Sequence, residues 1–408
     1  MTLRKLGRVT AYLLFLLVVC LVSSEIFLRF LLPASQGYFI WPPNLHVVFK
    51  PTPETTPGVS GDGDFRSNSL GLRSDEPPPD RQQTIYVFGG STAIDVYLDQ
   101  KRSWVYQVQT KLNATSGESK TWVGNLARSS LSTVSNLLIF KYLMPHLPKP
   151  DLFVNLVGVN DLQLALKSSY LKDMTMDRHM SFTFSEMPSQ NFWSGLAVSR
   201  FYQRIKDWRI KANMGVTQTY GGDGFTAWRK CRAEAPPDKL VDELPDLSAA
   251  LDQYRRNLHE LVKQGNAYGA TTIFLTQPTV WSDHIGPAEL SQLLAGGIGP
   301  NNVWCVDHRY YSPRALAEGM AMFNHVLLDV CRDLELFCVD LASEVPKRAR
   351  YYFDDMHYSD AGADLVSDVV SRKIIEFQAQ NGGSLHMASH QTLASPGKIG
   401  SVSVGSGQ

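Results

Sequence analysis

The stretch that decides the fold is TIYVFGGST, residues Thr84 to Thr92. Its β-favouring residues Ile85 to Phe88 are followed at once by Gly89 and Gly90, and then by Ser91. Branched and aromatic side chains favour strands, and paired glycines permit a tight turn. Ligands of open α/β sheets bind at the carboxyl ends of the strands. The stretch therefore predicts a strand, a tight turn, and a serine at the ligand-binding edge of a sheet.

Strands and helices alternate on both sides of this stretch. Strands are predicted at residues 84–88, 121–127, 151–157, 271–277 and 336–341. Helices are predicted at residues 103–112, 131–147, 249–264, 312–334 and 360–377. The near-continuous apolar run at 151–157 suits a parallel strand buried on both faces. We therefore expect a three-layer α/β/α domain over residues 84–377, with a mainly parallel five-stranded sheet.

Three segments fall outside this alternation. Residues 33–83 are rich in Pro, Gly, Thr and Asp, which predicts a linker that packs onto the domain. Residues 165–245 are an insertion expected over the mouth of the site. Within it, the basic stretch 200–211 is either a solvated helix face or a contact for an anionic glycan or lipid headgroups. The Gly/Ser-rich residues 378–408 are predicted to be disordered.

The N-terminal sequence predicts a membrane-spanning segment. Residues 1–9 carry three basic side chains, and residues 10–32 are mostly apolar. Positive charge before the segment predicts a cytoplasmic N-terminus, a single-pass signal-anchor at 10–32, and a domain on the extracytoplasmic (periplasmic) side of the cell membrane. The alternative is a signal peptide cleaved after the small residues Val22 to Ser24.

The charge balance and the cysteine content limit which binding partners and metal sites the sequence predicts. The 39 basic side chains equal the 39 acidic ones, so no global field favours nucleic acid. Besides Cys20, the chain has Cys231, Cys305, Cys331 and Cys338. None forms a C-x-x-C pair, so no metal site is predicted. These four residues either form two disulfides, as an extracytoplasmic domain allows, or remain unpaired thiols.

The predicted strand ends carry a nucleophile, a base and an orienting group. A nucleophilic serine needs a base within hydrogen-bond reach, and the base needs a group that orients it. Ser91 is the candidate nucleophile and His357 the candidate base. Asp354 lies three residues before His357 and is the expected orienting group, with Asp355 as the alternative.

Acyl transfer also needs donors aimed where the oxyanion forms. The N–H of Ser91, the backbone near Ser130 and the side-chain amide of Asn160 can supply them. Gln277 and Trp281 follow a predicted strand and are candidates for substrate contact. The chain has no G-x-S-x-G sequence, so the usual α/β-hydrolase arrangement is not predicted.

The chain resembles the SGNH (GDSL-type) hydrolase superfamily, specifically its membrane-anchored bacterial members. Four blocks carry the resemblance, in order: Gly89-Gly90-Ser91-Thr92, Asn125 to Ser130, Gly158-Val159-Asn160-Asp161 and Asp354-Asp355-Met356-His357. The resemblance spans about residues 65–375, apart from the insertion. It implies a flavodoxin-like fold and no cofactor. Two positions depart from the family pattern, because Gly90 replaces the usual Asp and Ser130 replaces the oxyanion glycine.

The resemblance implies a serine esterase. The expected substrate is an ester-linked acyl group, with acetyl favoured, on a carbohydrate or lipid outside the cytoplasm. One alternative is an O-acyltransferase acting on an envelope polysaccharide. Another is a non-catalytic envelope assembly or binding protein on the same scaffold. The first two share an acyl-enzyme and differ in the acceptor.

Overall fold

The centre of the molecule is a parallel sheet with the strand order β4-β3-β5-β7. The computed structural model describes residues 3–32, 34–115, 120–166, 176–189, 193, 195–202, 205, 223–298 and 309–381. The strands are β3 (Gln83–Gly89), β4 (Thr121–Asn125), β5 (Leu152–Leu156) and β7 (Thr271–Leu275). In register, Val87 of β3 pairs with Asn125 of β4 and with Val154 of β5. Every residue of β4, β5 and β7 is buried, as expected for a sheet covered on both faces.

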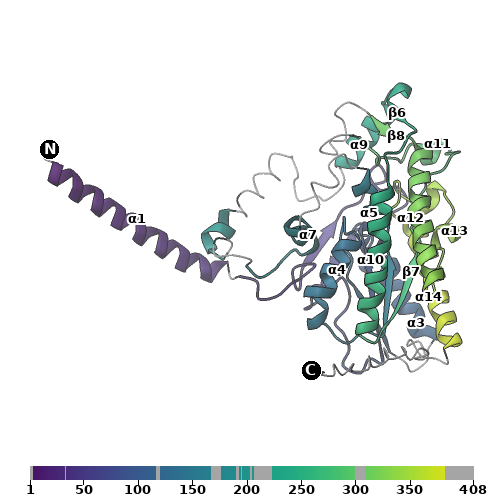
Figure 1. Ribbon diagram of the computed structural model, residues 1–408, viewed down its shortest axis with the longest axis horizontal. Helices are drawn as coiled ribbons and strands as arrows, with labels where there is room; N and C mark the ends of the chain where they lie inside the picture. The colour runs from purple at the N-terminus through teal and green to yellow at the C-terminus, as the bar shows by residue number, and fades with distance from the viewer. Residues whose placement is uncertain are drawn as a thin grey trace, which may run out of the picture.

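Helices cover the two faces of this sheet, which gives the predicted three-layer α/β/α class (Figure 1). One layer holds α3 (Trp104–Thr115) and α14 (Asp360–Gln380), which pack together. The other holds α4 (Thr133–Tyr142), α10 (Ser248–Ala267) and α12 (Pro313–Asp333). The connections β3 to β4 and β4 to β5 run in opposite directions along the sheet. Right-handed crossovers therefore place α3 and α4 on opposite faces.

The predicted fifth strand at 336–341 is wrong. Only Val339 joins the sheet there, through a single parallel bridge to Leu275. The chain turns away directly after it, because the Asp340 carboxylate accepts a hydrogen bond from the Thr276 hydroxyl at 2.7 Å and α13 (Leu341–Glu344) begins. The sheet therefore has four strands where five were predicted.

The predicted helices form, and their ends follow local rules. The Ser312 hydroxyl accepts from the Ala315 N–H at 3.1 Å at the start of α12, and Ser359 does the same for Gly362 at α14. The predicted helix at 131–147 is interrupted instead, and a 3-10 turn η2 (Met144–His146) follows α4. The remaining short elements of the core are α2 (Ser91–Ile94), η1 (Gln100–Arg102), α5 (Val159–Ala165), α11 (Pro287–Leu290) and η4 (Ala349–Tyr351).

Part of the predicted linker is folded. It contains β1 (His46–Phe49) and β2 (Gly63–Arg66), which pair antiparallel. Phe65 and Leu72 of this segment are buried in the core. The insertion contributes α7 (Met176–Thr183), α9 (Asp223–Ala233), η3 (Pro237–Lys239) and β6 (Leu240–Val241), and β6 pairs with β8 (Tyr310–Tyr311). The short strands β1, β2, β6 and β8 were not predicted.

The N-terminal helix α1 (Leu3–Leu31) extends away from the body of the molecule (Figure 1). Its stretch Gly7–Leu31 has a mean hydropathy of 2.4 and is long and apolar enough to cross a membrane, a test that a signal sequence also passes. The predicted disordered tail begins at residue 378, but α14 (Asp360–Gln380) continues through its first residues, and residues 382–408 lie outside the described part of the chain. Residues 203, 204 and 206–211 of the basic stretch also lie outside it.

The cysteines are largely paired. Cys331 at the end of α12 is bonded to Cys338, with 6.2 Å between their Cα atoms. Cys231 is disulfide-bonded as well. Among the described cysteines only Cys20 is free. Of the two alternatives for the domain cysteines, these bonds support the disulfides.

Candidate active site

Ser91 lies where the leading sequence stretch predicted it. It is the first residue of α2, directly after β3, and its side chain is half-buried. The first N–H groups of a helix have no partner within that helix. The N–H of Ser91 is therefore available to an oxygen held against this turn, although α2 itself is a single turn long.

Asp354 and His357 form a buried pair. The Asp354 Oδ2 lies 2.7 Å from the His357 Nδ1, and its Oδ1 accepts the backbone N–H groups of Met356 and His357 at 2.9 Å each. Asp354 is fully buried, and three nitrogen atoms hold its carboxylate, so that both oxygens are occupied. The ring of Phe353 stacks on the imidazole, with 5.4 Å between the ring centroids. This geometry leaves Nε2 as the free nitrogen of the imidazole.

The alternative orienting group, Asp355, has a different role. Its carboxylate accepts the Trp281 indole N–H at 2.7 Å and the backbone N–H groups of Leu294 and Ala295 at 2.7 and 2.9 Å. Asp355 therefore ties two neighbouring loops together, and the structure assigns the contact with His357 to Asp354.

The pKa shifts of His357 and Asp354 are consistent with a charged contact between them. Burial alone lowers the pKa of His357, but the charge and hydrogen bond of Asp354 outweigh it, so this pKa lies above the usual 6.5. Burial raises the pKa of Asp354, and the charge and hydrogen bond of His357 with the two backbone N–H groups bring it below the usual 3.8. Asp354 is therefore the charged member that stabilises an imidazolium when one forms.

Asn160 lies directly against the turn that carries Ser91. It is buried near the start of α5, and its Nδ2 donates to the Leu131 carbonyl at 2.9 Å. A Cβ on Gly90 would stand only 1.9 Å from this Nδ2. This close approach explains the departure at position 90, because any side chain there displaces the amide.

Ser130 adopts a backbone conformation that is typical of glycine. Its φ of 67° lies in the left-handed region, which non-glycine residues seldom adopt. The resemblance places the family's oxyanion glycine at this position, and the chain keeps that conformation with a serine. The side chain of Ser130 is exposed.

The five predicted catalytic and oxyanion residues meet in one pocket of about 340 Å³. They are Ser91, Ser130, Asn160, Asp354 and His357. Among the hydrogen bonds of the described residues, none joins the Ser91 hydroxyl to His357. Such contacts are often loose before a substrate is bound. The chain thus brings a hydroxyl, an oriented imidazole and candidate oxyanion donors to one cavity.

An aromatic wall completes the pocket, and the sequence reasoning missed it. The wall consists of Tyr97, Phe225, Trp228 and Phe353. Phe225 contacts both Tyr97 and Trp228, with 5.6 Å between ring centroids in each pair. Phe225 and Trp228 come from α9, so residues of the insertion line this pocket. Their spacing of three residues, which places two aromatics on one helix face, was the available signal.

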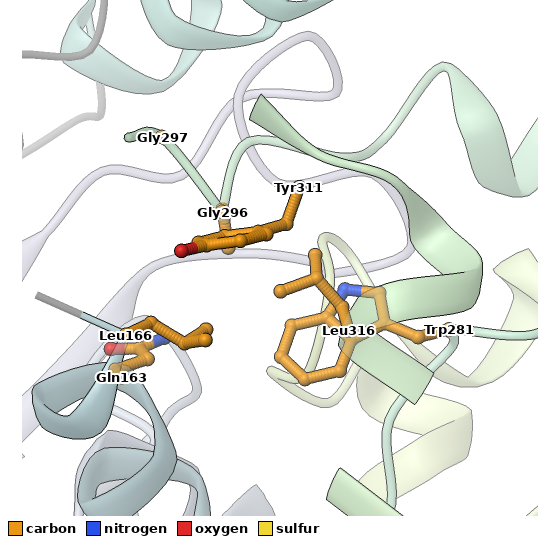
Figure 2. A pocket seen from close by; sticks show the side chains of 8 residues that line it. Gln163, Leu166, Trp281, Gly296, Gly297, Tyr311 and Leu316 are labelled. Atoms are coloured by element: carbon orange, nitrogen blue, oxygen red, sulfur yellow. The ribbon is translucent and has the colours of Figure 1, made fainter. Parts of the chain in front are cut away.

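The two predicted substrate contacts lie elsewhere. Gln277 is buried, and its Oε1 accepts the Thr92 hydroxyl at 3.1 Å. Trp281 is fully buried and lines a second, smaller cavity of about 60 Å³ with Tyr311 and Leu316 (Figure 2). Neither residue lines the pocket that holds Ser91, so their positions give no support to substrate contact. Among the described side chains, no group of three or more His, Cys, Asp or Glu residues could hold a metal ion.

Comparisons with known proteins find similar folds. No protein-family model matches the chain, and no curated protein matches it in sequence. Many solved structures are similar to it in fold, and three of them serve as examples. An α/β hydrolase from the metagenome of Lake Arreo is 13% identical, with a TM-score of 0.39 over 74% of this chain and 96% of that one.

The other two are named as esterases. An acetylxylan esterase from Geobacillus stearothermophilus is 12% identical, with a TM-score of 0.37 over 72% of this chain and 94% of that one. A psychrotrophic esterase from Pseudoalteromonas sp. is 13% identical, with a TM-score of 0.37 over 73% of this chain and 100% of that one. At these identities the likeness concerns the fold.

Proposed function

We propose that the protein is a serine esterase. The observation that carries this proposal is the buried Asp354–His357 pair, 2.7 Å between Oδ2 and Nδ1, in the same pocket as Ser91 and Asn160. A serine, an imidazole and a carboxylate in these roles recur on unrelated folds and are recognised by geometry.

The reaction proceeds in two halves. The Ser91 Oγ attacks the ester carbonyl while the His357 Nε2 takes its proton, and Asp354 stabilises the imidazolium. The Asn160 amide with the N–H groups of Ser91 and Ser130 holds the negative oxygen. His357 returns the proton to the departing alcohol, which leaves an acyl group on Ser91. Water activated by His357 then releases the acid and restores the serine.

The proposed substrate is an acyl ester, most simply an acetyl ester, of a carbohydrate or lipid. A sugar hydroxyl that replaces water in the second half makes the same site an acyltransferase. Product analysis with and without added sugar separates the two, because transfer yields an acylated sugar and hydrolysis yields only free acid.

The proposed location is the cell membrane, with the domain outside the cytoplasm. The apolar length of α1 and the basic residues in its first turns support an anchor of this orientation. The disulfide between Cys331 and Cys338 supports an oxidising compartment.

A fluorophosphonate probe tests the proposed chemistry. The protein is labelled, and the modified residue is mapped by mass spectrometry in the wild type, Ser91→Ala and His357→Ala. We expect labelling at Ser91 that disappears in both variants. A folded wild-type protein that takes up no label, or takes it up elsewhere, contradicts the esterase proposal.

A further inference from the structure

The apolar stretch of α1 contains one acidic side chain. Glu25 lies within Gly7–Leu31, six residues before its end, and six residues of helix are about 9 Å long. In the proposed anchor, the stretch is about 37 Å long against a hydrocarbon core of about 30 Å, so its last turns lie among the headgroups and Glu25 lies near the hydrocarbon boundary. An ionisable group at this depth is costly unless it has partners, and it marks a functional site.

The partners of Glu25 come from its own helix and from the insertion. Its carboxylate accepts the Arg29 Nε–H at 2.8 Å, and it accepts the backbone N–H groups of Ala197 and Val198 at 2.9 and 3.0 Å. Residues 197–202 are helical, and the first N–H groups of a helix have no partner within it. Glu25 thus supplies the acceptor that these N–H groups need where water is scarce.

A second set of hydrogen bonds runs from the insertion back to α1. Arg200 donates from Nε and Nη2 to the Leu32 carbonyl at 3.1 and 2.7 Å, and from Nη1 to the Gly195 carbonyl at 2.9 Å. The carbonyls at the end of a helix also lack partners within it, and a basic side chain is favourable there. The segment 195–202 and the end of α1 therefore form one unit, and Figure 1 shows the short helix of this segment, in teal, beside the end of α1.

One face of this short helix is apolar and exposed. Val198, Phe201 and Tyr202 are 36%, 44% and 64% exposed, and their spacing of three and four residues places them on one side of the helix. Ala197, by contrast, is fully buried. The end of α1 is exposed as well, with Phe30 at 83%, so the apolar surface of α1 continues onto the segment. An amphipathic helix with aromatic side chains suits the boundary between headgroups and acyl chains.

We propose that the segment 195–202 is a second membrane contact, which lies in the outer interface of the bilayer that α1 spans. Val198, Phe201 and Tyr202 face the lipids, and Glu25 holds the segment at this depth. The inference rests on the proposed anchor and goes beyond it, because it assigns a lipid-binding surface to the insertion and a role to the acidic residue of α1. Two contacts restrict how this end of the chain rotates in the bilayer, which a single helix does not.

Quenching by lipids tests the proposal. The full chain is placed in phosphatidylcholine vesicles with a fluorophore on Tyr202→Cys, and Cys20→Ser removes the cysteine that is free among those described. We expect lipids spin-labelled near the top of the acyl chain to lower the fluorescence about twofold or more, and aqueous iodide to have little effect. Lys263→Cys on α10, where the native side chain is 76% exposed, is the matched control and should respond to iodide only.

Two outcomes of this measurement overturn the inference. In the first, iodide quenches the label on Tyr202→Cys and the spin-labelled lipids do not, which places the segment in water. In the second, neither quencher reaches the label, which shows that protein covers this face. A crosslink from Tyr202→Cys to a second chain then identifies another copy as the occupant.

A substitution in α1 tests the role of Glu25 and separates this inference from the anchor proposal. Glu25→Ala removes the acceptor of two N–H groups, so lipid quenching of the label on Tyr202→Cys should fall about twofold, and Glu25→Gln, which keeps one acceptor, should lie between. Both variants should still sediment with membranes, because neither makes α1 less apolar. Unchanged quenching in Glu25→Ala overturns the role of Glu25. A sedimenting chain with a label in water overturns only this inference, whereas a wild type that alkaline carbonate releases overturns the anchor as well.

Discussion

At the scale of single residues, the site depends on how closely Asn160 approaches the Ser91 turn. The absence of a side chain at Gly90 is what permits the approach, because a Cβ there would meet the Asn160 Nδ2 at 1.9 Å. Position 90 is therefore coupled to the proposed oxyanion donor and not only to the turn.

Gly90→Ala should lower the proposed esterase activity about as much as removing the Asn160 amide by Asn160→Ala should. The new methyl group displaces the Asn160 amide, and the loss of one oxyanion donor lowers turnover about 100-fold or more. Overpacking should also lower the free energy of unfolding by about 1–3 kcal/mol. Ester hydrolysis and urea denaturation check both effects. Gly297→Ala is the control, since its nearest neighbour is the Tyr310 ring at 3.7 Å. A Gly90→Ala protein with wild-type turnover contradicts the placement of Asn160.

The pH dependence of activity reports on the Asp354–His357 pair. His357 must be neutral to accept the Ser91 proton, and its pKa lies above 6.5. We expect kcat/KM on p-nitrophenyl acetate to rise with pH, with a midpoint above 6.5. Asp354→Asn removes the charge that raises this pKa, so the midpoint should move to lower pH while the rate falls by about 10⁴. A profile with the same midpoint in both proteins would show that Asp354 does not act on His357.

The proposed catalytic residues could be located from the sequence, and the residues that form the rest of the pocket could not. Ser91 follows a strand end and His357 precedes a long helix, so local pattern fixes where both lie. The pairing of His357 with Asp354 follows from three-residue spacing. The aromatic wall of Tyr97, Phe225, Trp228 and Phe353 is built from segments far apart in the sequence, so its position is a product of packing. Trp281 looked like a substrate contact because nothing in the sequence shows that its indole N–H bonds Asp355.

At the scale of secondary-structure elements, those with a local sequence pattern could be predicted, and those positioned by long-range contacts could not. The strands β3, β4, β5 and β7 were predicted because each is a short apolar run. Residues 336–341 carry a similar pattern but form only the bridge at Val339, since the hydrogen bond of Asp340 to Thr276 and the start of α13 end the pairing. Helix α9 was recognised only as part of an insertion. Its place over the site is set by side-chain contacts across long sequence separations.

Arg229 is one of two arginines, with Arg232, that hold α9 against neighbouring loops. Its guanidinium donates to the carbonyls of Phe353 at 2.6 Å, Glu54 at 2.8 Å and Gln292 at 3.2 Å. Arg229→Ala should lower the free energy of unfolding by about 2 kcal/mol. It should also raise KM severalfold, because the α9 part of the aromatic wall loses its support. Thermal denaturation and steady-state kinetics measure these effects.

The matched control for Arg229 lies next to it on α9. Lys230→Ala removes a side chain that is 72% exposed and should change neither quantity. Arg229→Lys keeps the charge but cannot reach three carbonyls with one ammonium group, so it should fall between the wild type and Arg229→Ala. If Arg229→Ala matches Lys230→Ala in both measurements, α9 is held by other contacts.

At the scale of the whole molecule, the base of α1 is joined to the insertion. The Glu25 carboxylate accepts the backbone N–H groups of Ala197 and Val198 at 2.9 and 3.0 Å. Arg200 donates to the Leu32 carbonyl at 2.7 Å. The apolar surface of α1 is exposed along its length, which a lipid bilayer would cover.

Exposed aromatic residues lie at the C-terminal end of α1 and in the segment of the insertion that contacts this end. Phe30 is 83% exposed on α1, and Trp193 and Tyr202 of the insertion are 71% and 64% exposed. Aromatic side chains are enriched where a spanning helix meets the membrane surface. This placement suits an anchor whose outer end carries the domain close to the bilayer.

The anchor proposal predicts an uncleaved, membrane-bound protein. The stretch Gly7–Leu31 is about 37 Å long as a helix, which spans a hydrocarbon core of about 30 Å with some tilt. The full chain should therefore sediment with membranes after a carbonate wash. Its intact mass should show that the N-terminal residues are still present. Protease added from outside should reach its domain. A chain cut after Leu32 should be soluble and keep its esterase activity. A mature protein that begins at Glu25 would instead establish a cleaved signal peptide, since removal of the residues up to Ser24 leaves too little apolar length to span the bilayer.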